Sequence, residues 1–401
     1  MGWFWGKRFC VGLLLSIFTL SSAAGATAVS PRLKPAAPGP EYLSRLDHAR
    51  LLTIHGALEK KQFSLARAET KFVDDPTAKS LAQWLYLMAK DPNVDLSEAD
   101  AFLDAHPDWP ATDRIQSFVE SRIANTDAPE SIRTFFSMRS PITGDGKIQL
   151  ARAMLADGRG DDATALIRDA WINHNFTVAE ERRILQAYKS RLTKEDHAAR
   201  VDRLLWAIQV TNARRTFPYL SKKDRRMAEA RAALLMRASS AERLYKSLPE
   251  AEQVDSGVLH AAVRFYRRTD NQREAIALAA KAPAAADALR NPDRWWTERR
   301  ILVQWALKEG LLSDAYKLAA EHGGADGTDY SDAEFLAGWI ALRFLNEPSR
   351  AVTHFEAMTG AVATPISLSR GYYWLGRAAT AAGDMPAAES YYRSAADYHY
   401  S

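Results

Sequence analysis

Cysteine is almost absent from this sequence. Cys10 is the only one in 401 residues, so no intramolecular disulfide can form. Long hydrophobic runs are scarce too, because the apolar run at residues 11–20 is about half the roughly 20 residues of a membrane-spanning helix. No segment alternates apolar and polar residues as a half-buried strand does. Eleven Trp, 14 Tyr and 15 Phe residues nevertheless provide apolar surface, which excludes a largely disordered chain.

Motifs of common catalytic and cofactor chemistry are missing as well. The sequence has no HExxH or CxxC pattern, no GxSxG elbow, and no P-loop or dinucleotide fingerprint. The nine histidines form no cluster with Asp or Glu at one-turn spacing. His354 lies on an apolar helical face, where a hydrogen-bonded core histidine is the simplest interpretation. We therefore expect no metal, no cofactor and no catalytic residue in this chain.

The N-terminal segment has the layout of a secretory signal peptide. Lys7 and Arg8 precede the apolar run, and small residues follow it with cleavage-like patterns at 24–26 and 26–28. Cys10 precedes the apolar run, so it is not placed for lipid modification. We predict a signal peptide at 1–28, a proline-rich leader at 29–40, and export to the periplasm with no membrane span after signal removal.

From residue 41 onward, apolar residues recur at i, i+3, i+4 and i+7, the pattern of an amphipathic helix. In five segments an alanine starts this pattern, and a residue that tolerates left-handed backbone stands five positions earlier. The pairs are Gly158/Ala163, Asp270/Ala275, Gly310/Ala315, Asn346/Ala351 and Gly383/Ala388. The first member ends one helix, and the small alanine lets the next helix pack closely against it. Spacings of 40, 36 and 37 residues between the last four alanines predict stacked helical hairpins.

The final unit is the most regular. Its residues Tyr372, Leu375, Gly376, Ala379, Ala388, Tyr392 and Ala395 have the spacing of a tetratricopeptide repeat. The preceding unit departs from that motif, because Trp339 stands where the glycine is expected. We therefore predict an all-α fold for residues 41–401, a right-handed α-superhelix (solenoid) of tetratricopeptide-like helical hairpins, in preference to a compact bundle.

Positive charge is concentrated between residues 181 and 237. This segment has 15 Lys and Arg against six Asp and Glu, although the whole chain has a net charge of only +4. Solvated helix faces are one interpretation, and binding of an anionic polymer of the cell envelope is another. Nucleic acid is not an expected partner of an exported protein. The candidate contacts are Arg214, Arg215, Lys222, Lys223, Arg225 and Arg226.

Several sequence blocks resemble the superhelical N-terminal domain of soluble lytic murein transglycosylases. In order they are PDWP at 107–110, NPDRWWTERR at 291–300, AAEHG at 319–323, DAEFLAGWIALRF at 332–344, HFE at 354–356, TPIS at 364–367 and YWLGRAA at 373–379. The resemblance covers most of the chain after the leader and is strongest from Pro292 to Tyr398. Trp295, Trp296 and Trp339 have apolar neighbours at helical spacing, so core packing is their default role, with stacking on sugar rings as the alternative.

The resemblance implies that the parent enzymes cleave peptidoglycan between N-acetylmuramic acid and N-acetylglucosamine without water, forming an anhydromuramic product. Their chemistry belongs to a C-terminal lysozyme-like domain with a catalytic Glu-Ser pair. Here Glu-Ser occurs at Glu120, Glu130 and Glu389, and none is followed by the Gly-Leu-Met-Gln segment of the family. Since the sequence stops where the family continues into that domain, we expect a fragment or truncated frame without enzymatic activity of its own.

Two functions from different classes follow. The first is the non-catalytic superhelical portion of such an enzyme, which braces the catalytic domain of the same enzyme and helps to bind or orient peptidoglycan (murein) strands. The second is a stand-alone periplasmic tetratricopeptide-like scaffold that binds proteins.

Overall fold

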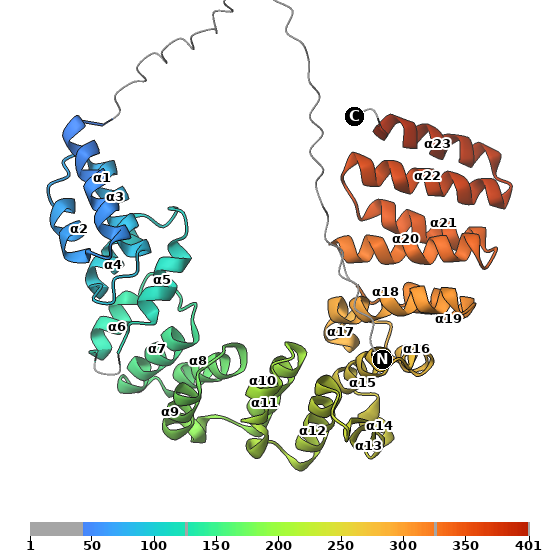
Figure 1. The fold of residues 1–401 in the computed structure, drawn as a ribbon, viewed down its shortest axis with the longest axis horizontal. Coiled ribbons are helices and arrows are strands. Elements are labelled where there is room, and N and C mark those ends of the chain that lie inside the picture. The colour runs from blue at the N-terminus through green and yellow to red at the C-terminus, as the bar shows by residue number, and fades with distance from the viewer. Residues whose placement is uncertain (1–42, 125–126, 325–326, 400–401) are drawn as a thin grey trace, which may run out of the picture. The chain divides into compact units, whose positions relative to one another are not determined.

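The computed structural model describes residues 43–124, 127–324 and 327–399, and these ranges contain helices and no β-strand. The expected signal peptide, the leader and Cys10 lie outside the described residues. The chain divides into two compact units at Ala89 (Figure 1). Within the described part, no helix is both long enough and apolar enough to cross a membrane.

The first unit consists of α1 (Arg45–Glu59), α2 (Phe63–Thr70) and α3 (Pro76–Met88), which pack against one another. Its core includes the buried Ile54. Asp47 near the start of α1 is also buried, and its carboxylate accepts hydrogen bonds from the backbone N–H of Asp74 (3.0 Å) and Asp75 (3.3 Å). Asp75 in turn caps α3 by accepting from Ala78 N–H at 2.7 Å. One buried carboxylate therefore fixes where α3 begins relative to α1.

The second unit contains the remaining helices. Its first half comprises α4 (Leu96–Ala105), α5 (Thr112–Glu120), α6 (Pro129–Phe135), α7 (Gly144–Ala156), α8 (Gly160–Asn173), α9 (Val178–Tyr188), the 3-10 turn η1 (Lys189–Arg191), α10 (Lys194–Trp206), α11 (Val210–Arg214), the 3-10 turn η2 (Phe217–Tyr219) and α12 (Lys222–Met236). Its second half comprises α13 (Ala241–Lys246), α14 (Glu250–Gln253), α15 (Ser256–Arg268), α16 (Gln272–Ala279), α17 (Ala286–Leu289), α18 (Pro292–Lys308), α19 (Leu312–Ala320), α20 (Gly327–Arg343), α21 (Pro348–Gly360), α22 (Pro365–Ala382) and α23 (Met385–His399).

All five predicted hairpin turns are present. Their first members have positive φ angles, at Gly158 (76°), Asp270 (58°), Gly310 (73°), Asn346 (55°) and Gly383 (81°), and each paired alanine is fully or almost fully buried. After Gly383, for example, the N–H of Asp384 bonds the carbonyl of Ala379 at 3.0 Å, which satisfies a carbonyl that the helix end leaves free. The prediction of an all-α solenoid of helical hairpins is confirmed.

Two further helical hairpins with the same kind of turn were not predicted. Lys61 and Ile208 have φ angles of 55° and 59°, and five residues after each stands a fully buried alanine, Ala66 or Ala213. The N–H of Gln209 bonds the carbonyl of Leu204 at 2.8 Å, the same closing bond as in the predicted turns. Neither Lys nor a β-branched Ile favours left-handed backbone. Tertiary packing therefore imposes these two turns.

In the hairpin that contains Trp339, the two helices approach closely at a glycine, as in a tetratricopeptide repeat. That glycine lies one residue before the expected position. The turn between α20 and α21 is one residue longer than the others, because the N–H of Glu347 bonds the carbonyl of Ala341, six residues earlier. Gly338 therefore takes the position expected of residue 339. A Cβ on Gly338 would lie 2.8 Å from Cε1 of Phe355. In the last unit, a Cβ on Gly376 would lie 2.6 Å from Cε1 of Tyr392.

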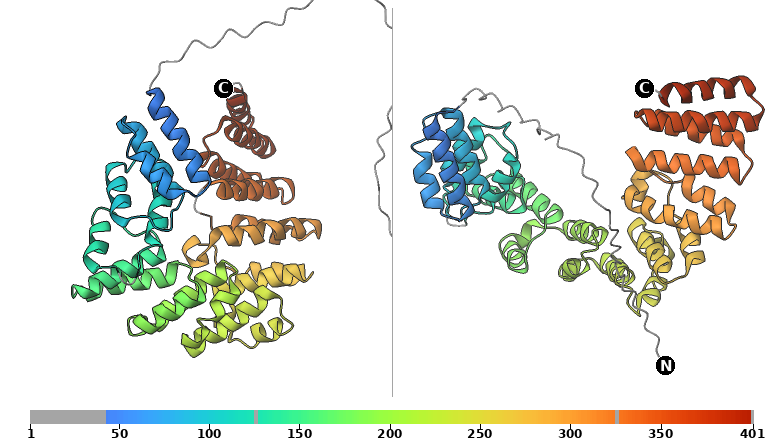
Figure 2. Two further views of the ribbon diagram at one scale, coloured as in Figure 1. Left: turned by 60° about the vertical axis from the view of Figure 1, so that its left-hand side comes forward. Right: turned by 45° about the horizontal axis from the view of Figure 1, so that its top comes forward.

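The apolar core passes from hairpin to hairpin. Helices α20 to α23 lie side by side, each packed on the next, in all views (Figures 1 and 2). Leu235 packs against the core clusters on both sides of α12, and Tyr316 and Trp339 join the clusters on both sides of α20. Trp295 and Trp296 are buried and Trp339 is half-buried, which confirms core packing as their role. Each hairpin thus completes the core of its neighbours.

We expect Gly338→Ala to lower the free energy of unfolding by about 1–3 kcal/mol, because its methyl group would overlap the Phe355 ring. Gly360→Ala is the matched control on the partner helix. No atom lies within 4 Å of a Cβ there, so a gain of up to roughly 1 kcal/mol is expected from the better helix propensity of alanine. Urea unfolding followed by circular dichroism measures both, and equal effects would contradict the close-packing role of Gly338.

Candidate functional site

The six basic residues singled out by the sequence lie on two consecutive helices. Arg214 and Arg215 stand at the end of α11, and Lys222, Lys223, Arg225 and Arg226 lie in the first turns of α12. Arg225 pairs with Glu229 at 2.8 Å, and Arg226 pairs with Glu252 on α14 at 2.5 Å. Among the residues that the structure describes, Arg214, Lys222 and Lys223 are exposed and have no carboxylate partner. Three of the six cations therefore remain available to a ligand.

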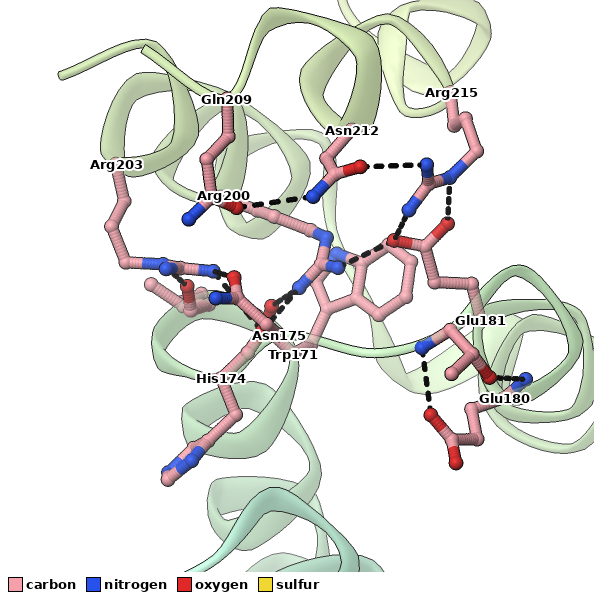
Figure 3. Close-up of polar contacts among 12 residues, drawn as sticks. Trp171, His174, Asn175, Glu180, Glu181, Arg200, Arg203, Gln209, Asn212 and Arg215 are labelled. Carbon is pink, nitrogen blue, oxygen red and sulfur yellow. Dashed lines mark hydrogen bonds and ion pairs between the residues drawn. The ribbon is translucent and has the colours of Figure 1, made fainter. Parts of the chain in front are cut away.

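Arg215 belongs to a buried network centred on Glu181 (Figure 3). The carboxylate of Glu181, at the start of α9, accepts hydrogen bonds from Arg215 at 2.5 and 2.9 Å and from Arg200 of α10 at 2.7 Å. Asn212 bonds the other side of the Arg215 guanidinium at 2.9 Å. Only 1% of the Arg200 side chain is exposed. The network ties α9, α10 and α11 together.

The charges of this network are mutually compensating. Burial alone would raise the pKa of Glu181, but the hydrogen bonds from Arg215 and Arg200 outweigh it and hold that pKa below its usual value. Burial lowers the pKa of Arg200, and the hydrogen bond to Glu181 opposes that shift. Removing either partner would leave a buried charge without compensation.

The carboxyl end of α8 provides a second set of acceptors. Arg200 donates to the carbonyl oxygens of Trp171 and His174, and its guanidinium lies 4.2 Å from the Trp171 ring centroid. Arg203 donates to the carbonyls of Ile172 (2.5 Å) and His174 (3.0 Å). These carbonyls belong to the last turn of α8, which has no further helix turn to satisfy them and carries the negative end of the helix dipole.

A comparable arrangement lies further along the unit. Arg299 of α18 is almost fully buried and donates to the carbonyls of Glu321, Ala282 (3.4 Å) and Pro283 (3.2 Å), next to the ends of α19 and α16. Burial lowers the pKa of Arg299 to about 10, so its guanidinium stays charged at neutral pH. Arg231 of α12 is also buried and pairs with Asp202 of α10. Within residues 181–237, Arg200 and Arg231 are therefore internal, a role that neither sequence interpretation of the segment included, while most of its other cations lie on exposed helix faces.

The histidines of the repeats are also structural. His354 donates from Nδ1 to Glu334 at 2.6 Å and its Nε2 faces the hydroxyl of Tyr316 at 2.8 Å, which confirms the predicted hydrogen-bonded core histidine. His322 contacts the other carboxylate oxygen of Glu334 at 3.0 Å. Burial alone would raise the pKa of Glu334, but these two histidines hold it at about 2. The cluster joins α19, α20 and α21, and the described residues contain no group of side chains placed to hold a metal.

His260 is buried between two tryptophan rings. The centroids of Trp206 and Trp295 lie 4.8 and 5.2 Å from its own, and its Nε2 lies 3.2 Å from the carbonyl oxygen of Arg294. Burial lowers the pKa of His260 to about 4, so the imidazole is neutral in the folded protein at neutral pH.

The three Glu-Ser pairs occupy unrelated places. Glu120 is fully buried, and its carboxylate accepts hydrogen bonds from the backbone N–H of Ile142 (3.0 Å) and Thr143 (2.7 Å). Glu130 is exposed, and Glu389 is an exposed residue of α23 that pairs with Arg393 at 2.6 Å. The Glu120 carboxylate therefore orders the loop before α7, and the other two lie on open helix surfaces.

Comparisons with known proteins find distant structural likenesses. Neither a protein-family model nor a curated protein matches the sequence. Similar solved structures include the 70 kDa soluble lytic transglycosylase from Escherichia coli, with 12% sequence identity and a TM-score of 0.42. The match covers 86% of this chain and 72% of that chain. A complex of the 70-kDa soluble lytic transglycosylase with bulgecin A has the same identity and coverage at a TM-score of 0.40. The APC/C hetero-tetramer Cut9-Hcn1 matches with 12% identity over 88% of this chain and 87% of that chain, at 0.24.

We expect Glu181→Gln to destabilise the protein by about 3–5 kcal/mol, because it leaves the buried charge of Arg200 uncompensated. Glu229→Gln removes one carboxylate as well, but from the exposed pair with Arg225, and should cost less than about 0.5 kcal/mol. The two variants change net charge equally, so urea unfolding separates burial from charge. A loss of the same size in both would show that the buried network adds nothing.

A second prediction concerns acid stability. The unfolded chain protonates His260 near pH 6.5, whereas the folded protein resists protonation until about pH 4. Because the unfolded chain then binds a proton that the folded protein does not, the free energy of unfolding falls as the pH drops from 6.5 towards 4. The loss is roughly 2 kcal/mol at pH 5, and little is lost above pH 6.5. In His260→Gln, the loss of stability between pH 7 and pH 5 should shrink by about that amount. Urea midpoints at the two pH values test this, and the exposed His55→Gln variant should keep the full dependence.

Proposed function

We propose that this chain is the non-catalytic superhelical portion of a periplasmic soluble lytic murein transglycosylase. In this function it braces the catalytic domain and helps to bind or orient peptidoglycan strands for non-hydrolytic cleavage to anhydromuropeptides. The signal-peptide layout of residues 1–28 supports the periplasmic location.

The observation that carries the proposal is the position of the family-like blocks in the framework. Trp295 and Arg299, from the first strong block, are both buried. Trp295 donates to the hydroxyl of Ser256 on α15 at 3.1 Å, and Arg299 lies where α18 meets the ends of α16 and α19. Gly338, from the second, is the site of close approach to α21, and Gly376 of the last block has the same role towards α23. The residues that resemble the family are thus the ones that join hairpin to hairpin. This supports a framework of the same kind.

The alternative function, a periplasmic scaffold for proteins, is favoured by one observation. The last unit has the full tetratricopeptide spacing, and its Gly376 packs on Tyr392. The two functions differ in their ligand. A protein scaffold has no reason to be retained by purified, protein-free peptidoglycan.

We expect the chain from residue 29 onward to be retained by purified peptidoglycan sacculi. Arg214, Lys222 and Lys223 are exposed and form no ion pair within the described residues, so they are available to the carboxylates of the stem peptides. At roughly 0.5 kcal/mol each, their joint replacement by Gln should weaken binding about tenfold and flatten its salt dependence.

A control variant replaces three other exposed cations, Arg268, Lys281 and Arg343, by Gln. It changes the net charge equally and should bind as the unmodified chain does. Equal weakening in both variants would show that net charge alone matters. No retention of the unmodified chain at low salt would contradict the proposed function and favour the scaffold.

A further inference from the structure

A groove of about 420 Å³ runs between α7 and α9, outside the network of Glu181. Its floor is apolar and includes Ile148 and Ile184. Its walls are polar and comprise Asp145, Gln149 and Arg152 from α7 with Glu180, Arg183, Gln186 and Tyr188 from α9. The α7 side chains are spaced at i, i+4 and i+7, so they lie along one face of that helix. The volume is in the range of a small-molecule or sugar site.

Part of this lining is a fixed frame. Arg152 donates to the carbonyl of Asp127 at 2.9 Å and to the side-chain oxygen of Gln149 at 2.9 Å. Glu180 is held by the capping box of α9, in which its carboxylate accepts from Thr177 N–H at 2.7 Å. These groups shape the groove and have little freedom to move.

The other polar groups of the lining have no such bonds. Among the described residues, the side chains of Asp145, Arg183, Gln186 and Tyr188 make no hydrogen bond and no close ion pair, although the charge of Arg183 acts on Asp145 from across the groove and opposes the rise in its pKa that burial causes. Burial raises the pKa values of the Asp145 carboxyl and the Tyr188 phenol, so both are partly withdrawn from water at the groove. Unpaired polar groups around an apolar floor are typical of a binding site.

The lining also indicates the charge of the ligand. The lining contains two carboxyl groups, Asp145 and Glu180, and two guanidinium groups, Arg152 and Arg183, so the groove has no net charge. A polyanion would meet the carboxylates, and a polycation would meet the arginines. The groups without hydrogen bonds are one carboxyl, one guanidinium, one carboxamide and one phenol, which together can donate and accept hydrogen bonds.

We propose that this groove binds one or two N-acetylated amino-sugar units of a neutral glycan strand. The hydroxyl and acetamido groups of such a sugar donate and accept hydrogen bonds around the ring edge, while its ring face is apolar and suits the isoleucine floor. The proposal rests on the proposed function for the choice of glycan. It goes beyond the cationic residues of α11 and α12, because it assigns sugar recognition to a different pair of helices.

A second groove, of about 350 Å³, shows the contrast. It lies between α10, α12 and α15. Four of its five charged lining residues are already paired, with Asp202 bound to Arg231 and Asp255 bound to Arg290 at 2.5 Å, and the fifth, Asp224, accepts a hydrogen bond from the hydroxyl of Ser221. Ligands there would have to displace internal ion pairs. The groove between α7 and α9 requires no such exchange.

The test is calorimetric titration of the chain with tetra-N-acetylchitotetraose, a soluble oligomer of N-acetylglucosamine. We expect Arg183→Gln to weaken binding about fivefold and the Arg183→Gln/Tyr188→Phe double variant more than tenfold, since each loses a hydrogen bond to the sugar. Arg183 is exposed, so the single variant should not affect folding, which circular dichroism verifies. Arg182→Gln is the matched control, because Arg182 is an exposed neighbour on α9 that does not line the groove.

Sacculus retention, measured in parallel, separates this proposal from the proposed function. If sacculi retain the chain and chitotetraose does not bind, the groove assignment is overturned while the proposed function stands. If chitotetraose binds with the expected variant effects but sacculi do not retain the chain, the groove assignment holds and the proposed function fails. The groove assignment is overturned if the double variant binds the sugar as tightly as the unmodified chain. It is also overturned if a free stem peptide binds more tightly and displaces the sugar.

Discussion

Hydrogen bonds from buried arginines to the carboxyl ends of helices are the interaction on which the packing of the second unit depends. A solenoid of short helices has many helix ends, and each leaves carbonyl groups that the helix cannot satisfy. Arg200 satisfies two such carbonyls at the end of α8, and Arg299 satisfies three near the ends of α16 and α19. A guanidinium group suits this task, because its donors diverge in a plane and reach several acceptors at once. The helix dipoles also supply part of the compensating charge.

The turns show how far sequence reasoning reached. Where a turn uses Gly, Asn or Asp, the residue type itself reports left-handed backbone, and all five such turns were predicted correctly. Lys61 and Ile208 adopt the same backbone without a residue type that favours it, so their units were missed. Gly338 was overlooked for another reason. The expected glycine position assumes that every turn has the same length. The turn between α20 and α21 is one residue longer, so the glycine lies one residue earlier than expected.

The candidate site was harder to predict because pairing is not visible in a linear count of charges. Glu181 meets Arg200 and Arg215 across separations of 19 and 34 residues, and Arg226 meets Glu252 across 26. Each separation spans one or more helices, so only the stacking of the helices brings the partners together. The groove between α7 and α9 has the same origin. Its two sides are formed by α7 and α9, which are ordinary amphipathic helices. The sequence of either helix alone does not show that the two lie next to each other.

The repeated turn has a consequence for how such a chain can change over evolutionary time. In each of the seven hairpins with this turn, the turn combines one left-handed residue with one buried alanine, and Lys61 and Ile208 show that the first is open to substitution. The closing hydrogen bond is made by backbone atoms, which every residue except proline supplies. The sequence of the turn is therefore free to drift while the hairpin connection is kept. A fold encoded this sparsely can persist after its sequences have lost detectable similarity.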